Sequence, residues 1–301
     1  MSKTTKWILG IAVAFFIFFG FFALTMLSWM FSDPEEETIS PGGEKIALIE
    51  LIEPIMSSES TVQQFKKYRE NRSVKAIVFR VESPGGGVAA SQEIYEEVKK
   101  TRDSGKPVVV SMGSVAASGG YYVSCGASRI VANPGTLTGS IGVIFQFLQV
   151  TDLMKKIGVD QATFKSGKLK DAGSPFRKTN TDDEKYFDGL IADVYDQFVN
   201  VVSTERKLDV KYVKRFADGR VFTGRQAKEY GFIDTLGTFE DAVAIAAKLG
   251  GIEGKPRIVK EYRRKSFLER VLGEAVTDVA KLRDEFLHQP IIQYRFSAPN
   301  Q

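Results

Sequence analysis

The 301-residue sequence predicts an α/β protein with a mainly parallel sheet, preceded by one long apolar segment. Three features indicate this fold. Runs of β-branched residues alternate with amphipathic segments from residue 45 to about 250, the pattern of strands joined by crossover helices. Glycine clusters follow several of these runs, and residues 7–31 carry no charge. Because parallel strands end at one edge of a sheet, a functional site is expected at their carboxyl ends.

The apolar segment Trp7 to Phe31 is predicted to be a transmembrane anchor. Its 25 residues are long enough, as a helix, to cross a hydrocarbon core of roughly 30 Å. A cleaved signal peptide is the alternative, but its apolar region usually has only about 7 to 15 residues. Lysines lie in residues 1–6 and acidic residues in 33–37. The positive-inside rule therefore predicts a cytoplasmic N-terminus, with the rest of the chain outside.

The remaining chain is expected to form a linker, one domain and an extension. The linker covers 32–44 and contains Pro-Gly-Gly, the domain covers 45–250, and a basic extension covers 251–301. The longest helix is expected at 181–207, with a capping box of Thr181 and Glu184. Within the domain, extended segments are expected at 45–56, 74–81, 108–110, 129–132, 161–165, 221–223 and 232–234, and further helices at 61–71, 88–100, 147–158, 226–230 and 238–249.

Composition excludes several classes of function. With 43% hydrophobic and 26% charged residues the chain is ordinary globular protein, and its net charge of +4 does not indicate a nucleic-acid partner. The single cysteine, Cys125, excludes an internal disulfide and a cysteine-based zinc site. The single histidine, His288, lies beyond the recognisable folded segments, so a Ser-His-Asp triad is not favoured. No metal or cofactor is expected.

The stretch from Val108 to Val123, VVVSMGSVAASGGYYV, is the best candidate for a catalytic site. A serine followed by glycine after a buried strand is where acyl-transfer enzymes place a nucleophile, because the next N–H group can face an oxyanion. Ser118 precedes two glycines, whereas Ser114 could cap the helix and Ser124 should lie inside it. From the residues alone Ser118 and Ser114 remain equal candidates, and the small residues could also serve packing only.

The scarcity of histidine restricts the possible general base to a carboxylate or a lysine. A free lysine has a pKa near 10.4, so burial must lower that pKa by about 3 units before the amine can act as a base near neutral pH. A serine–lysine pair therefore requires an apolar, enclosed site.

Five sequence strings recur in the order typical of one family. They are ESPGGGV, SMGSVAASGGYYVS, TGSIGV, FKSGKLKDAGSP and ADGRVFTGRQAKEYGFID, spread between residues 46 and about 250. Through them the chain resembles the bacterial signal peptide peptidase family (SppA type), in its short, single-repeat, membrane-anchored form. The resemblance implies a Clp/crotonase-like spiral of β-β-α units.

The resemblance also implies roles for individual residues. Ser118 matches the nucleophile and Lys170 the general base, with Lys165 and Lys168 as rivals. Two glycines, Gly86 and Gly119, match the positions whose N–H groups form the oxyanion hole.

One further serine completes the implied site. Ser140 matches a serine that orients the lysine, while Gly139 is expected to serve only the turn.

The implied protein is a membrane-anchored serine endopeptidase of the bacterial cytoplasmic membrane. It would hydrolyse signal-peptide remnants and further short apolar peptides, contact membrane lipid, and form a ring-shaped homo-oligomer that encloses the site. A stomatin-operon protease would have the same pair of residues, but such proteins carry further apolar spans, and 250–301 contains none. A crotonase-type acyl-CoA enzyme and a catalytically inactive membrane scaffold are two more candidates. The basic residues of 255–265 are expected to form a solvated tail rather than a lipid-phosphate site.

Overall fold

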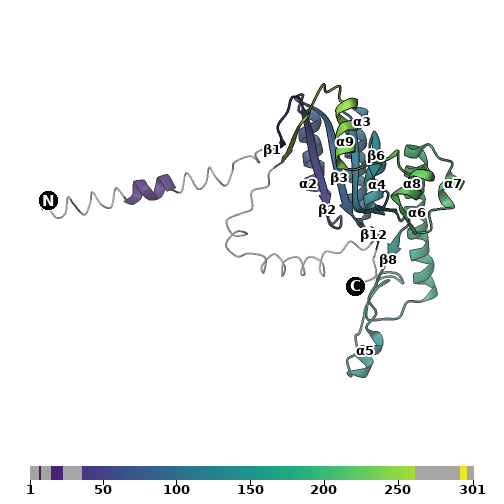
Figure 1. Cartoon of the computed structure of the whole chain (residues 1–301). Coiled ribbons are helices and arrows are strands. Elements are labelled where there is room, and N and C mark those ends of the chain that lie inside the picture. The colour runs from purple at the N-terminus through teal and green to yellow at the C-terminus, as the bar shows by residue number, and fades with distance from the viewer. Residues whose placement is uncertain (1–6, 8–14, 23–35, 262–291, 297–301) are drawn as a thin grey trace.

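A computed structural model describes Trp7 and residues 15–22, 36–261 and 292–296 (Figure 1). The strands are β1 (Glu36–Ser40), β2 (Lys45–Ile52), β3 (Val74–Ser83), β4 (Gly85–Gly87), β5 (Val108–Ala117), β6 (Arg129–Ala132), β7 (Leu137–Gly139), β8 (Ile144–Phe145), β9 (Val221–Thr223), β10 (Thr235–Leu236), β11 (Arg257–Glu261) and β12 (Ile292–Arg295). The helices are α2 (Glu59–Glu70), α3 (Val88–Asp103), α4 (Gly119–Cys125), α5 (Thr151–Lys156), α6 (Thr181–Arg206), α7 (Val210–Lys214), α8 (Gly224–Glu229) and α9 (Phe239–Leu249).

The predicted α/β class with a mainly parallel sheet is confirmed. The large sheet has the strand order β1-β11-β2-β3-β5-β6-β10, and its neighbours are parallel except for the antiparallel pair β1 and β11. The last residues of β5 pair in parallel with β7, which in turn pairs with β9 in an antiparallel arrangement. A second, three-stranded sheet has the order β4-β12-β8. The carboxyl end of β5 therefore lies where several strands meet.

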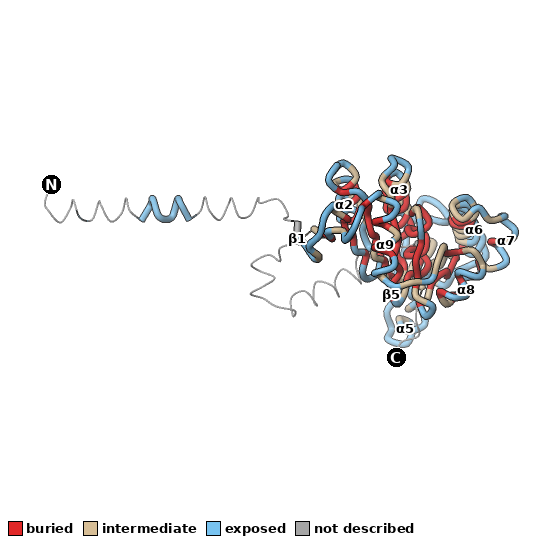
Figure 2. Tube along the Cα trace, turned by 45° about the horizontal axis from the view of Figure 1, so that its top comes forward, coloured by how far each residue is buried: buried red, intermediate tan, exposed pale blue. Residues whose placement is uncertain are grey.

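Side chains of both sheet faces are buried, because helices cover each face. One face of β2 and β3, represented by Ile49 and Phe79, packs into the larger core with Phe65 of α2 and Phe198 of α6. The other face, which includes Val78, packs against α9. Buried residues follow the strands through the middle of the molecule (Figure 2). Burial on both faces explains why these strands read as continuous apolar runs.

Two segments expected outside the domain add strands to its sheet. Residues 36–40 of the expected linker form β1, and residues 257–261 of the expected extension form β11, which pairs with β2. Ile258 and Val259 are buried there. Basic residues surround this apolar pair in the sequence, so the strand signal at residues 257–261 was weak.

Local boundaries differ in three further places. The capping box of α6 is formed by Asn180 and Asp183, one residue before the predicted pair, because the Asn180 side chain accepts from the Asp182 and Asp183 N–H groups. Residues 161–165 form no strand, and the helix expected at 147–158 shortens to α5. Residues 232–234, expected to be extended, form no strand, and the nearby strand β10 begins at Thr235.

The predicted anchor at 7–31 lies mostly outside the described residues. Residues 15–22 are helical and exposed. Within the described part of the chain, the structure contains no helix with both the length and the apolar character needed to cross a bilayer. The transmembrane span remains a prediction.

Candidate active site

Ser118 occupies a sharp turn between the end of β5 and the start of α4. Its N–H group donates to the Gly139 carbonyl at 2.7 Å, and its own carbonyl accepts from Tyr122 at 2.8 Å to begin the helix. The backbone has φ of 54° and ψ of −116°, and the side chain makes no capping bond. Such backbone geometry costs on the order of 1–3 kcal/mol in a residue other than glycine and is concentrated at functional sites. Ser118 is buried, with 1% of its surface exposed, and the neighbouring Gly85 and Gly86 pair with β12.

Gly119 and Gly86, the two predicted oxyanion-hole residues, lie side by side. A Cβ atom placed on Gly119 would lie 3.2 Å from the Gly86 nitrogen and 2.7 Å from the Ser91 hydroxyl oxygen. The neighbouring Gly85 has φ of 95°, and a Cβ atom there would lie 2.5 Å from the Gly119 nitrogen. Close approach of these backbones therefore requires glycine at all three positions. The arrangement places the backbones of Gly86 and Gly119 in close contact beside Ser118.

Replacement of Gly119 by alanine is expected to lower kcat strongly without unfolding the chain. The new methyl group would push Gly119 away from Ser91 and Gly86, and loss of one oxyanion-hole donor typically costs about 10²- to 10³-fold in kcat. Gly135→Ala is the matched control, because a Cβ atom there meets nothing within 4 Å. Steady-state hydrolysis and thermal unfolding of both variants test this. Equal kcat values for the two variants would contradict the assignment of Gly119.

Ser140 follows Gly139, whose carbonyl bonds to Ser118, and is buried. Its N–H group donates to the Arg220 carbonyl at 2.8 Å, and Gly139, its neighbour, accepts the bond from Ser118. Ser140 and Ile144 line a cavity of about 590 Å³ together with Phe296. A chain passing along β8 and β12 would reach this cavity directly. The role of Ser140 in orienting a lysine remains a prediction.

Lys170 is not brought to Ser118 within this chain. It lies on residues 146–180, which we call the arm, and the arm projects from the body with α5 near its end (Figure 1). Lys170 is exposed, whereas Ser118 is buried. Among the described residues, no hydrogen bond or ion pair joins the Lys170 side chain to Ser118 or Ser140.

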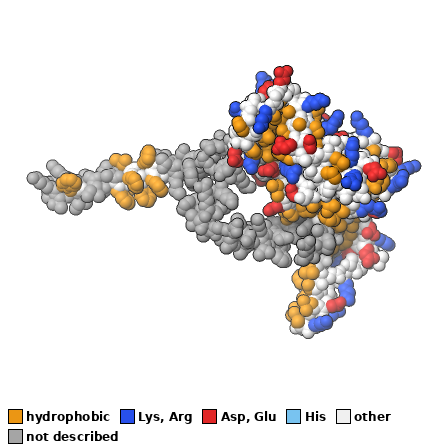
Figure 3. Space-filling view, in the orientation of Figure 1, with side chains coloured by type: hydrophobic (Ala, Val, Ile, Leu, Met, Phe, Trp, Pro, Cys, Tyr) orange, Lys and Arg blue, Asp and Glu red, His pale blue; other side chains and the backbone are white. Residues whose placement is uncertain are grey.

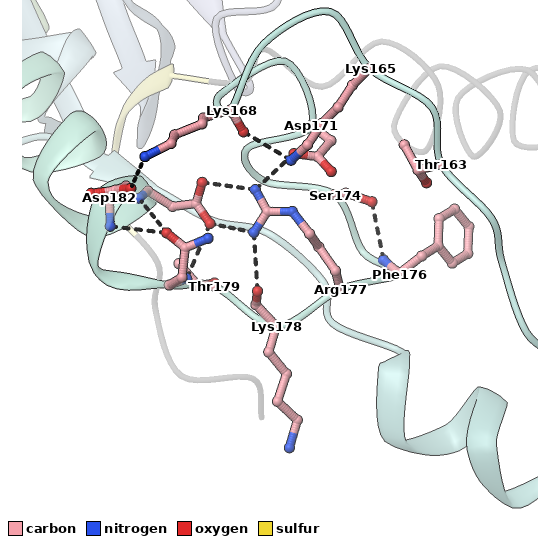
Figure 4. A network of polar contacts seen from close by, with 12 residues as sticks. Thr163, Lys165, Lys168, Asp171, Ser174, Phe176, Arg177, Lys178, Thr179 and Asp182 are labelled. Atoms are coloured by element: carbon pink, nitrogen blue, oxygen red, sulfur yellow. Dashed lines mark hydrogen bonds and ion pairs between the residues drawn. The ribbon is translucent and has the colours of Figure 1, made fainter.

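Ion pairs hold the part of the arm around Asp171 in a defined shape (Figure 4). Arg177 bonds to Asp171 at 2.9 Å and to both oxygens of Asp183, and Lys165 bonds to Asp171 at 2.6 Å. Hydrogen bonds from Arg177, and then from Lys165, lower the pKa of Asp171 to about 2. Asp171 is therefore charged across the physiological range, and the network stays intact there.

The same contacts separate the three candidate lysines. Lys165 donates to Asp171 and to the Lys168 carbonyl, and Lys168 lies 3.8 Å from Asp182. Lys170 has no ion pair with any residue that the structure describes. A side chain that no ion pair holds among the described residues is free to turn toward a substrate or another copy of the chain. This difference favours Lys170 over its two rivals.

The other candidate nucleophiles are placed less well. Ser114 is exposed within β5 rather than at a helix cap, and its N–H group donates to Glu82. Ser124 is buried inside α4, as expected. Burial raises the pKa of the Cys125 thiol to about 12, so this residue is not a thiolate at neutral pH. His288 lies outside the described residues.

Sequence reasoning missed two features of the site. Gly85 was not assigned a role, although the three consecutive glycines and its position directly before Gly86 were a usable signal. The second is β12, which pairs with β4 through contacts across more than 200 residues of sequence. No local pattern in a short, mixed segment predicts such a pairing.

Comparison with known proteins gives matches along most of this domain. A family model described as peptidase family S49 matches residues 100–253, and one described as Clp protease matches residues 44–136. The second match agrees with the observed sheet, which is a Clp protease-like α/β fold. The spiral arrangement of β-β-α units remains a prediction.

Individual relatives are similar over the same region. An Enterococcus faecium protein, described by its name as a signal peptide peptidase SppA, is 43% identical over 62% of this chain and 54% of its own length. A Synechocystis protein named as a protease is 44% identical over 70% of this chain and 76% of its own length. Protease 4 of Salmonella typhi is 40% identical over 66% of this chain and 32% of its own length. The match thus spans about half, three quarters and one third of the lengths of these three relatives, in that order.

Proposed function

The chain belongs to peptidase family S49, a family of serine proteases, and we propose that Ser118 is its nucleophile and Lys170 its general base. The observation that carries the proposal is the turn at Ser118, a strained serine beside the N–H groups of Gly86 and Gly119. Acyl transfer requires donors beside the nucleophile, because negative charge develops on the carbonyl oxygen next to the attacking hydroxyl.

The proposed reaction runs in two steps. Neutral Lys170 accepts the Ser118 hydroxyl proton while Oγ attacks the peptide carbonyl, and the Gly86 and Gly119 N–H groups bind the resulting oxyanion. The ammonium group then gives its proton to the departing amine, which leaves an acyl-serine. In the second step Lys170 deprotonates a water molecule that attacks the acyl carbonyl. The ammonium group then returns this proton to Ser118 Oγ as the acid leaves, which restores Ser118.

We propose that a second copy of the chain supplies Lys170. The arm carries several exposed apolar side chains, among them Phe164 at 97% and Leu148 at 76% exposure, and Figure 3 shows hydrophobic side chains gathered on it. Exposed apolar patches of this kind mark interaction sites. Contact with a neighbouring copy would cover these side chains and carry Lys170 out of water. A homo-oligomer would thereby give Lys170 the enclosed surroundings that a lysine base needs.

The proposed substrates are short apolar peptides, including remnants of signal peptides. A membrane anchor at 7–31 in the bacterial cytoplasmic membrane would place the domain outside the cell, close to peptides leaving the bilayer. The similarity to proteins named as signal peptide peptidase and protease 4 supports this assignment.

Hydrolysis of a fluorogenic apolar peptide by the full chain in detergent micelles tests the proposed function. Turnover that a serine-reactive phosphonate blocks is the expected result. A well-folded chain that cleaves neither apolar nor polar peptides would instead indicate an inactive scaffold.

A further inference from the structure

Arg177 joins the part of the arm next to Lys170 to the start of α6. Its guanidinium group donates to Asp171 at 2.9 Å and to both carboxylate oxygens of Asp183, one of them at 2.8 Å. Figure 4 shows Arg177 at the centre of this network, with a further bond to the Lys178 carbonyl at 3.1 Å. A planar guanidinium group can hold two carboxylates in one fixed geometry. We call Arg177, Asp171 and Asp183 the clamp.

Asp183 connects the clamp to the body of the protein. Its side chain is 1% exposed and also accepts from the Asn180 N–H group at 3.1 Å, within the capping box of α6. Farther along the same helix, Phe198 and Val202 are buried in the larger core. The carboxylate of Asp183 therefore has a fixed position relative to the sheet.

Asp171 connects the clamp to Lys170. The two residues are consecutive, so their Cα atoms are only about 3.8 Å apart. The Lys170 N–H group donates to the Gly167 carbonyl at 3.2 Å, and the Ser174 N–H group donates to the Asp171 carbonyl at 3.0 Å. Tight turns thus lie on both sides of the lysine in residues 167–174, which we call the base loop. Movement of Lys170 is limited as long as Asp171 is held.

A second attachment holds the base loop on the same face of α6. Gly173 has φ of 78°, and a Cβ atom placed on it would lie 2.5 Å from the Phe147 ring. That ring packs on Phe187 of α6, with ring centroids 4.7 Å apart. Asp183 and Phe187 are four residues apart and so share one face of the helix. One polar and one aromatic attachment therefore fix the base loop to α6.

We propose that Arg177 is a positioning residue for the general base, because it holds the base loop so that Lys170 meets the Ser118 of a neighbouring copy in a single geometry. The inference rests on the proposed function. Lys165 and Lys168 have carboxylate partners, whereas Lys170 has none among the described residues, so its placement depends on the backbone that carries it. A misplacement of about 1 Å in an active site can lower the rate by about 10²-fold. The clamp is the part of the chain that supplies the required precision.

Replacement of Arg177 by alanine in the full chain, in detergent micelles, tests this role. With a fluorogenic apolar peptide, kcat should fall by roughly 10- to 100-fold while KM changes by less than about 2-fold, because the base is misplaced and the substrate site is intact. Arg177→Lys should give an intermediate kcat, because an ammonium group cannot bridge both carboxylates as the guanidinium group does.

Lys178→Ala is the matched control for this change. It removes the neighbouring cation, whose ion pair with Asp152 is exposed on both sides, and should leave kcat unchanged. Thermal unfolding and analytical ultracentrifugation show whether each variant folds and assembles like the native chain. Equal kcat values for Arg177→Ala and Lys178→Ala would overturn the proposal. A loss of kcat that accompanies a loss of assembly would overturn it too.

A double variant tests whether the clamp acts as one unit. Asp171→Asn weakens the bonds from Arg177 and Lys165 to the base loop and should lower kcat with KM unchanged. Arg177→Ala combined with Asp171→Asn should lose little more than the larger of the two single losses. Losses that multiply would contradict a shared role. If Arg177→Ala does not fold, Asp171→Asn still decides, because it keeps the bonds between Arg177 and Asp183.

Proteolysis separates this inference from the proposed function. In the Ser118→Ala chain, addition of Arg177→Ala should speed tryptic cleavage after the lysines of residues 165–170 by several fold relative to addition of Lys178→Ala, because the base loop opens more often. Mass spectrometry identifies the cut sites. Faster cleavage of a chain whose native form hydrolyses no peptide would support the clamp and reject only the proposed function. Native hydrolysis that Arg177→Ala leaves unchanged would reject the positioning role alone.

Discussion

Replacing Ser118 by alanine is expected to reduce peptide hydrolysis by on the order of 10⁴-fold or more, the usual consequence of removing a serine nucleophile. The fold should survive, because the Ser118 side chain makes no capping bond and alanine can keep the backbone bond to Gly139. Lys170→Ala should have a similar effect, because it removes the proposed general base. Steady-state kinetics and circular dichroism of the purified variants test both statements.

Matched variants control for general damage near the site. Ser114→Ala removes an exposed hydroxyl from the same strand, and Lys168→Ala removes a lysine two residues from Lys170. Both should keep nearly full activity. Full hydrolysis by Ser118→Ala or by Lys170→Ala would reject the serine–lysine pair, and inactivity of Lys168→Ala alone would move the base to that lysine.

Mixing the two inactive variants is expected to restore activity. If Ser118 of one copy works with Lys170 of its neighbour, each contact between a Lys170→Ala chain and a Ser118→Ala chain can contain one intact pair. Random exchange of equal amounts in a closed ring gives intact pairs at about one quarter of sites, so activity near a quarter of the native value is expected. Hydrolysis measured against time after mixing, under conditions that allow subunit exchange, tests this.

Energy transfer between fluorescently labelled copies is the necessary control, because it shows whether the subunits exchange. Exchange without recovery of activity would mean that the pair forms within one chain, through movement of the arm toward Ser118. Because Lys170 is exposed in the single chain, we expect recovery of activity.

The sheet could be predicted because its signals are local. Strands β3 and β6 consist of β-branched, largely buried runs. Such a continuous apolar run can be recognised in the sequence without knowing which strand it pairs with. The glycines after Ser118 limited the candidate nucleophile to Ser118 or Ser114. The family motifs then favoured Ser118. The capping box was displaced by one residue because Asn180 and Thr181 are both good capping residues and only packing decides between them.

Long-range pairings could not be predicted. Strand β11 joins β2 although its short sequence mixes charged and apolar residues. Strand β12 pairs with the glycines of β4 through its backbone, so its own composition gives little signal. The environment of Lys170 has the same origin. Its sequence context gives the residue, whereas the surface that would cover it in the proposed oligomer belongs to another copy of the chain.

Labelling of the native full chain with a fluorophosphonate tests the central claim most directly, because the reagent bonds only to an activated hydroxyl. Digestion and mass spectrometry should find one modified serine, Ser118, and Lys170→Ala should abolish the labelling while Lys168→Ala leaves it unchanged. Labelling of Ser114 or Ser140 in place of Ser118 would contradict the assignment of the nucleophile.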